Sequence, residues 1–245
     1  MHEKEQKITY YDLDFLGKVK LSAILKMVHI AADENAAVLG FGFEEMSRTG
    51  MSFVLQRFAL GVNRMPAYGE TVKIRTWPDS ISRGIFLRKG DMHDKSGNKI
   101  MQWASMWILF DIAARKILKP SALPIKIKEF PNLGVEISPQ KIILPAEEAA
   151  VFSAHTHTVR YADVDTNLHM NNSIYGDLIG NAIFSSLENQ NSFENFREVQ
   201  INYLAETYFG DKIEVSFFNA DDFIIVGKTR GKISFSAQIT REAIQ

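Results

Sequence analysis

Two segments of the chain carry apolar residues at helical spacing. From Ser22 to Gly40 the apolar positions recur three or four residues apart, and Gly40 is a natural stop, so we predict a helix there. Its many alanines leave little polar face, which is typical of a helix wrapped by a sheet. A second segment, from about Asn172 to Leu187, has the same spacing and predicts a second helix.

After each predicted helix the pattern changes to short runs of the β type, separated by turn residues. In the first half the runs lie between Met51 and Phe110, with turns predicted at Pro66–Glu70, Pro78–Ser82 and Asp94–Asn98. In the second half, after an extended segment at His155–Tyr161, strands are predicted at Arg197–Leu204, Lys212–Phe218, Phe223–Lys228 and Lys232–Thr240. A helix followed by antiparallel strands, twice over, predicts an α+β fold.

The stretch between the two halves shows no sustained period. Residues 120–148 contain five prolines, and we interpret this stretch as a connection. We therefore predict an N-terminal unit at residues 1–125, a linker at residues 126–150 and a C-terminal unit at residues 151–245.

The two halves also share a sequence repeat. The aligned pairs are Tyr10 with Tyr161, Asp12 with Asp163, Asp14 with Asp165, Ser22 with Ser173, Gly69 with Gly210 and Glu70 with Asp211. Within this alignment Leu16 stands in place of Asn167, and Lys18 stands in place of His169. The repeat predicts a duplicated fold with one active site, in the second half.

The second copy of the repeat places a carboxylate, an amide and an imidazole at every second position. On an extended backbone Asp165, Asn167 and His169 would share one face. The following helix would point its free N–H groups at the same place. These groups together could attack an acyl carbonyl. Asx residues also gather at turns and helix starts for local reasons, and we assign Asn171 and Asn172 to that role.

Composition narrows the chemistry and the location. The chain has 245 residues, 46% of them hydrophobic, and no cysteine, which excludes disulfides, Cys-ligated zinc and a thiol nucleophile. A net charge of −1 gives no general attraction to nucleic acid or to an anionic membrane. No stretch approaches the length of a membrane span. We therefore expect a soluble, cytoplasmic protein.

Several other candidates have simpler explanations. His155 and His157 have a spacing that metals can use, but no further ligand stands close by in the sequence, so we expect no metal. Asp12 and Asp14 are interpreted as remnants of the repeat that bond backbone or solvent. Some basic residues could meet an acidic carrier protein, although surface solvation explains each of them: Arg83, Arg88, Lys89, Lys126 and Lys128.

The second copy resembles the signature of a known family. Its residues Asp163-Val-Asp165-Thr-Asn167-Leu-His169-Met-Asn171-Asn172, followed by Tyr175, resemble the Asp-x-Asp-x-Asn-x-His-x-Asn-Asn motif of acyl-ACP thioesterases. That family fuses two hot-dog units, in each of which an antiparallel sheet wraps a long helix. The resemblance therefore implies a tandem double hot-dog fold. It also implies hydrolysis of the thioester between a fatty acyl chain and the phosphopantetheine arm of acyl carrier protein, without a cofactor.

The resemblance places Asp165, Asn167 and His169 at the active-site positions of the family. On the following strand the family often has Tyr-x-x-Glu-Cys, and this chain has Tyr203-Leu-Ala-Glu206-Thr207. The acidic position is retained, but a papain-like thiol mechanism is impossible, and we expect Thr207 to be dispensable. The resemblance points instead to attack by water.

In such a reaction Asp165 or Glu206 would take the proton from water, and Asn167 would hold the water or the carbonyl in line. His169 would donate a hydrogen bond to the carbonyl oxygen or orient a carboxylate, and N–H groups at the helix start would stabilise the oxyanion. A covalent anhydride through Asp165 stays open.

Two alternatives to an acyl-ACP hydrolase stay open at this point. One is an acyl-CoA thioesterase of the same fold, and the other is a protein that binds acyl thioesters without turnover. We expect a monomer or a homodimer. Because the first half has lost the amide and the imidazole but kept its apolar helix and strands, we predict that it holds the acyl chain.

Overall fold

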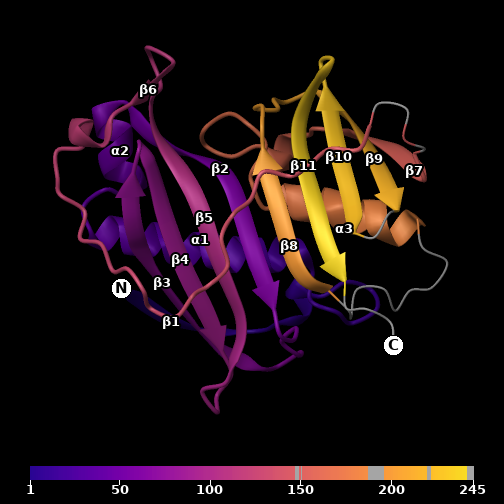
Figure 1. The fold of residues 1–245 in the computed structure, drawn as a ribbon, viewed down its shortest axis with the longest axis horizontal. Helices are drawn as coiled ribbons and strands as arrows, with labels where there is room; N and C mark the ends of the chain where they lie inside the picture. Colours follow the sequence, from indigo (N-terminus) through magenta and orange to yellow (C-terminus); the bar gives the residue numbers. More distant parts are fainter. Residues whose placement is uncertain (147–148, 150, 187–195, 220–221, 242–245) are drawn as a thin grey trace. The chain divides into compact units, whose positions relative to one another are not determined.

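The structure is a computed structural model that describes residues 1–146, 149, 151–186, 196–219 and 222–241. The chain forms two compact units (Figure 1). The first contains Met1–Tyr10 and Lys26–Pro139, and the second contains Tyr11–Leu25 and Gln140–Gln245. A short segment from the N-terminal part of the chain is thus a component of the second unit. The predicted linker at residues 126–150 stays a prediction.

The first unit is an antiparallel sheet with the strand order β1-β3-β4-β5-β2. The strands are β1 (His2–Lys7), β2 (Met51–Val62), β3 (Thr71–Ser82), β4 (Ile85–His93) and β5 (Lys99–Asp111), and β6 (Lys116–Leu118) pairs with β5. The helices are α1 (Leu21–Val38), which belongs to this unit from Lys26 onward, and the short α2 (Phe43–Thr49). There are also 3-10 turns at Tyr10–Asp12, of which Tyr10 belongs to this unit, and at Pro120–Ala122.

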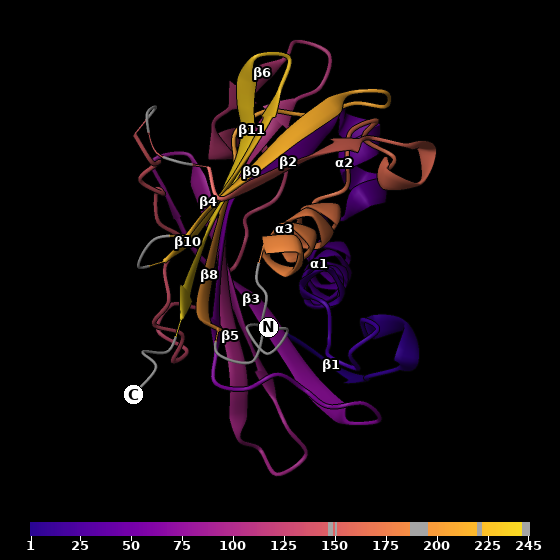
Figure 2. The same ribbon diagram turned by 90° about the vertical axis from the view of Figure 1, so that its right-hand side faces the viewer.

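Helix α1 lies against one face of this sheet (Figure 2). The His29 ring meets Phe58 of β2 and Trp107 of β5 edge to face, with ring centroids 5.9 and 6.1 Å apart. Arg88 of β4 donates from Nη1 to Asn35 Oδ1 at 2.8 Å. The helix is therefore fixed to three strands, as expected for a helix wrapped by a sheet.

The second unit repeats this plan with the strand order β7-β9-β10-β11-β8. Its strands are β7 (Ser153–Thr158), β8 (Phe196–Tyr203), β9 (Lys212–Asn219), β10 (Phe223–Thr229) and β11 (Lys232–Arg241), and its helix is α3 (Ile174–Ser186). Tyr175 of α3 packs edge to face on Tyr203 of β8 and Phe235 of β11. The order of elements matches the first unit strand by strand, which confirms the predicted α+β architecture and its duplication.

The predicted helices and strands are confirmed with small shifts at their ends. Helix α1 starts one residue before Ser22 and ends at Val38, ahead of Gly40, whose φ of +83° breaks the helical path. Helix α3 begins at Ile174, and the predicted last residue, Leu187, lies outside the described residues.

The predicted turn at Pro78–Ser82 is wrong, because β3 continues to Ser82. The register of β3 against β4 shifts between Pro78 and Ser80, and such a bulge is one of the few places where a strand accepts proline. The turn follows instead at Arg83 and Gly84, which both have positive φ, 50° and 82°, as a tight hairpin requires.

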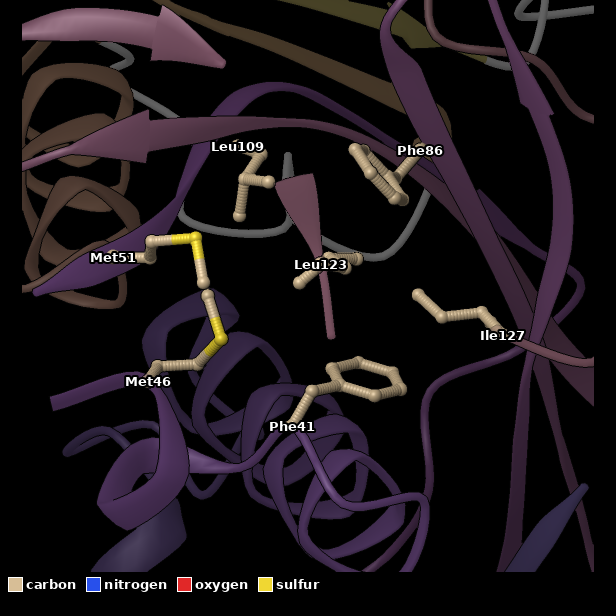
Figure 3. Packing of buried hydrophobic residues seen from close by; sticks show 7 residues of the cluster. All are labelled: Phe41, Met46, Met51, Phe86, Leu109, Leu123 and Ile127. Atoms are coloured by element: carbon tan, nitrogen blue, oxygen red, sulfur yellow. The ribbon is translucent and has the colours of Figure 1, made fainter. Parts of the chain in front are cut away.

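The connection between the halves is well packed. Leu123 and Ile127 join Phe41, Met46, Met51, Phe86 and Leu109 in one buried cluster of the first unit (Figure 3). In the second unit the backbone of this stretch is held by side chains of β8: Gln140 N–H donates to Gln200 Oε1 at 2.9 Å, and Ile142 N–H donates to Asn202 Oδ1 at 3.1 Å. An irregular segment that covers a core need not follow any apolar period.

Arg88 is excluded from any docking surface by its burial. Arg88 is only 8% exposed, and its guanidinium donates to Asn35 Oδ1 and to Thr76 Oγ1. Burial lowers the pKa of Arg88 to about 10. The sequence-based suggestion that Arg88 could meet a carrier protein is therefore wrong. No helix in the described part of the chain is long and apolar enough to cross a membrane.

Candidate active site

The motif of the second copy forms a tight turn. After a 3-10 turn at Tyr161–Asp163, Val164 and Met170 pair across an isolated bridge. Inside the bridge Asp165 N–H donates to the His169 carbonyl at 3.1 Å, and Asn167 N–H donates to Asp165 Oδ1 at 2.8 Å. The expectation of an extended backbone with three side chains on one face is therefore wrong. The backbones of Asp165 and His169 pair across the turn, and Asn167 lies between them in sequence.

The polar groups of this turn are accessible. Asp165 and His169 are half-buried and Asn167 is exposed, while Met170 behind them is buried. Among the residues that the structure describes, neither the Asn167 amide nor the His169 ring has a hydrogen-bond partner. Polar groups left open at a half-buried site are able to bind water or substrate.

The turn depends on a residue in a strained conformation. Leu168 has a φ of +66°, a left-handed value that costs a side-chain residue roughly 1–2 kcal/mol. Leu168 is also 75% exposed, so packing does not offset this cost. The first copy has Gly17 at this position, with a φ of +75°.

The first copy has the same backbone hydrogen bonds. Asp14 N–H donates to the Lys18 carbonyl at 2.8 Å, and Leu16 N–H donates to Asp14 Oδ1 at 2.9 Å. The carboxylate of Asp14 thus bonds backbone, as expected for a remnant of the repeat. In the segment before each turn, Ile8 N–H donates to the Glu70 carbonyl just as Val159 N–H donates to the Asp211 carbonyl. The sequence alignment of the two copies is therefore confirmed by geometry.

The loop with Glu206 lies beside the turn. Met170 N–H donates to the Thr207 carbonyl at 2.8 Å, so the residue after His169 is bonded to the residue after Glu206. Glu206 is half-buried, its carboxylate accepts a short hydrogen bond from Tyr208, and its carbonyl accepts one from Arg230 at 2.7 Å. The structure thus brings the segments of the four predicted site residues together. Their roles in chemistry stay a prediction.

Thr207 is an anchor that sequence reasoning missed. It is fully buried, and its Oγ1 lies 3.1 Å from Tyr175 Oη in α3. Nearby, Tyr203 Oη donates to the Asn172 carbonyl at 3.3 Å, and burial raises the pKa of Tyr175 to about 12. The only signal in the sequence was that threonine stands where the family often has cysteine, and this says nothing about burial.

The helix start is largely occupied by local bonds. Asn171 Oδ1 accepts from Ser173 N–H at 2.9 Å and from Ser173 Oγ at 2.8 Å, and the Asn171 carbonyl accepts from Ile174 N–H. The capping role predicted for Asn171 is confirmed. The Ser173, Ile174 and Gly176 N–H groups are all engaged, so the predicted oxyanion role of the helix start is wrong for these three.

Asp163 supports the turn from behind. Its Oδ2 accepts from Arg160 N–H at 2.9 Å and lies 2.9 Å from His157 Nε2. In the ranges that the structure describes, no group of three or more histidine or acidic side chains is arranged to hold a metal ion. The Asp163 carboxylate thus joins the start of the turn to His157 of β7.

Two family models match nearly the whole chain. The model of the acyl-ACP thioesterase N-terminal domain matches residues 1–121, and that of the C-terminal domain matches residues 146–243. Among curated proteins, the chain is 26% identical over 151 residues to a chloroplastic palmitoyl-acyl carrier protein thioesterase of Gossypium hirsutum, covering 58% of this chain and 36% of that protein. It is 26% identical over 176 residues to a dodecanoyl-[acyl-carrier-protein] hydrolase of Cinnamomum camphora, covering 66% of this chain and 45% of that one. The chain thus spans less than half the length of these relatives.

Solved structures share the fold over the full chain. An acyl-ACP thioesterase from Bacteroides thetaiotaomicron superposes with a TM-score of 0.84 at 22% identity, covering 98% of this chain and 97% of that one. The 12:0-ACP thioesterase from Umbellularia californica superposes with a TM-score of 0.80 at 18% identity, covering 98% and 96%. The predicted tandem double hot-dog fold is confirmed. With a model of the family matched on each half and its motif in the turn before α3, the chain belongs to the acyl-ACP thioesterase family.

Proposed function

We propose that the protein hydrolyses fatty acyl-[acyl carrier protein], releasing free fatty acid and holo-ACP. The observation that carries this proposal is the turn at Asp165–His169, which offers a carboxylate, an amide and an imidazole beside the Glu206 loop. The Asn167 and His169 side chains have no protein partner within the described ranges, so they are free to bind a substrate.

In the proposed reaction water attacks the carbonyl carbon of the thioester, and Asp165 or Glu206 takes the proton of the water. Asn167 orients the water or the carbonyl, and His169 donates a hydrogen bond to the developing oxyanion. The C–S bond then breaks, and the carboxyl group returns the proton to the departing thiolate. A free acid and the thiol of the phosphopantetheine arm are the products.

Family membership supports the acyl carrier protein as the partner, and the absence of cysteine supports water as the attacking group. Under this proposal the protein works in the cytoplasm, where it meets acyl carrier protein.

The test is to incubate the pure protein with acyl-ACP and with acyl-CoA of several chain lengths and to follow the release of free thiol. We expect faster release from acyl-ACP. Faster release from acyl-CoA would assign the protein to the other carrier. Binding of acyl-ACP without any release would show a binding protein and would overturn the proposal.

The choice between attack by water and an anhydride at Asp165 needs a separate experiment. An anhydride would be trapped by hydroxylamine during turnover as a hydroxamate on the protein or on the acyl chain. We expect hydroxylamine to leave Asp165 unmodified.

A further inference from the structure

A pair of buried hydroxyl groups joins the Glu206 loop to α3. Thr207 Oγ1 and Tyr175 Oη lie 3.1 Å apart, and Thr207 and Tyr175 are 0% and 4% exposed. The Tyr175 ring is also packed edge to face on Tyr203 and Phe235, with centroids 5.2 and 5.1 Å apart. Its hydroxyl therefore occupies a fixed place, and the bond holds Thr207 at that place.

Thr207 is connected to three parts of the candidate active site at once. It directly follows Glu206 in the chain, its carbonyl accepts from Met170 N–H, and Met170 directly follows His169. Its hydroxyl meets the first turn of α3 through Tyr175. A shift of Thr207 would therefore change the separation between Glu206 and the turn with Asp165 and His169.

The first copy provides a comparison inside the same chain. Tyr208 N–H donates to Asp211 Oδ2, and at the matching place in the first copy Ala67 N–H donates to Glu70 Oε2, each at 2.8 Å. Tyr208 therefore aligns with Ala67, and Thr207, one residue earlier, aligns with Pro66. The spacing that aligns Ser22 with Ser173 also aligns Ile24 with Tyr175. Ile24 and Pro66 are both buried.

The matching positions of the first copy are thus buried and apolar. Burying a pair of hydroxyl groups gives little net stability over apolar groups of similar shape, because the groups lose their bonds to water. Stability alone therefore does not explain why the hydroxyl pair stands in the copy that carries the motif.

We propose that Thr207 and Tyr175 are positioning residues whose mutual hydrogen bond sets the place of Glu206 relative to the Asp165–His169 turn. The proposal rests on the proposed function. It also replaces the expectation that Thr207 is dispensable. In this role both residues act through the loop and the turn that they hold, and not through contact with the substrate.

The test is to measure kcat and KM on one acyl-ACP for Thr207→Val, Thr207→Ser, Tyr175→Phe and the double variant Thr207→Val/Tyr175→Phe. The valine and phenylalanine variants keep shape and remove the hydroxyl. Because displacement of a reacting group by about 1 Å costs up to about 100-fold, we expect kcat to fall roughly 10- to 100-fold with little change in KM. Thr207→Ser should retain most of kcat. The kcat of the double variant should be no lower than that of the less active single variant, because both substitutions remove the same hydrogen bond.

Thr229→Val is the matched control. Thr229 is another buried threonine of the second unit, 3% exposed, and its hydroxyl has no partner in the described part of the chain. Its kcat should equal that of the unchanged protein. Thermal unfolding of each variant identifies any that do not fold, and if Thr207→Val fails to fold, Tyr175→Phe and Thr207→Ser decide the question.

Unchanged kcat in folded Tyr175→Phe, or losses that multiply in the double variant, would overturn the proposal. An unchanged protein that releases no thiol from any acyl thioester would instead refute the proposed function. The two failures are therefore distinguishable.

Discussion

The side chains of Asn167 and His169 have no protein partner among the described residues, while their backbone is bonded within the turn. Asn167 N–H is bonded to Asp165, and the His169 carbonyl accepts from Asp165 N–H. A side chain that contributes no internal bond can be removed without loss of the turn.

We therefore expect Asn167→Ala and His169→Ala to fold normally and to lower turnover by roughly 10²–10⁴-fold, the usual effect of losing a positioned polar group in acid–base chemistry. Thiol release measures the turnover of each variant, and thermal unfolding shows whether it folds. Thr166→Ala, at an exposed position of the same turn, is the control and should keep full activity. A folded variant with normal turnover would remove that residue from the mechanism.

The sequence singled out these residues as candidates but did not predict the geometry of their backbone. The repeat and the motif led to Asp165, Asn167 and His169, whereas the alternating pattern suggested an extended strand. The turn depends on Leu168 at positive φ, and leucine gives no local signal for that conformation. The signal was present only in the other copy, as Gly17.

At the scale of elements, the helices and strands whose sequences have an apolar face were predicted well. Strand β1 was missed because it consists of polar and charged residues, His-Glu-Lys-Glu-Gln-Lys, and is held by pairing with β3. Charged edge strands of this kind protect a sheet from further pairing. Pro78 was interpreted as a turn because its bulge is set by the register against β4, which no local pattern encodes.

Gly176 of α3 lies so close to the backbone of Ser22 that a larger residue does not fit without a shift. A Cβ on Gly176 would lie 2.6 Å from Ser22 N and 2.8 Å from Ser22 Cα, and backbone atoms cannot move away freely. We expect Gly176→Ala to lower the free energy of unfolding by about 1–3 kcal/mol, although alanine favours a helix over glycine by about 1 kcal/mol.

Chemical denaturation measures this loss. Asn181→Ala, at an exposed position of the same helix, should change stability by less than about 0.5 kcal/mol. Equal stability of Gly176→Ala and the unchanged protein would show that the two segments separate at little cost.

Helix α1 contains a buried imidazole that links stability to pH. Burial lowers the pKa of His29 from 6.5 to about 4, and its Nε2 has no partner in the described residues. Between those pH values the unfolded chain binds a proton at His29 and the folded protein does not. The free energy of unfolding therefore falls as the pH falls through this window, by on the order of 3 kcal/mol.

His29→Phe keeps the edge-to-face contacts with Phe58 and Trp107 and removes the titration. We expect the variant to lose less stability than the unchanged protein between pH 6.5 and pH 4, as measured by urea unfolding at several pH values. Parallel pH profiles of the two proteins would contradict this.

At the scale of the molecule, the two units share one architecture and differ in chemistry. The first has Leu16 and Lys18 where the second has Asn167 and His169, and its interior is formed by α1 and the sheet. We keep the prediction that this interior sets the preferred length of the acyl chain.

The repeat supplies a matched pair of substitutions to test this. The spacing that aligns Ser22 with Ser173 also aligns Ala31 of α1 with Ala182 of α3. These two alanines are 0% and 1% exposed. Ala31→Leu should shorten the preferred acyl chain, because each methylene excluded from burial loses about 0.8 kcal/mol. Ala182→Leu should leave the profile unchanged. The profile of thiol release over acyl-ACPs of increasing length measures both, and the reverse result would move the pocket to the second unit.

The membership of Tyr11–Leu25 in the second unit has a consequence for synthesis on the ribosome. Phe15 packs edge to face on Phe184, with ring centroids 5.1 Å apart, and Ser22 Oγ donates to Asp177, which lies 155 residues later in the chain. Because synthesis adds about 5–20 residues per second, roughly 8–30 s pass between the synthesis of Ser22 and that of its partner Asp177. The first unit can form around α1 during that time, whereas the unit that carries the motif closes only when α3 and its strands, made later, pack on Tyr11–Leu25.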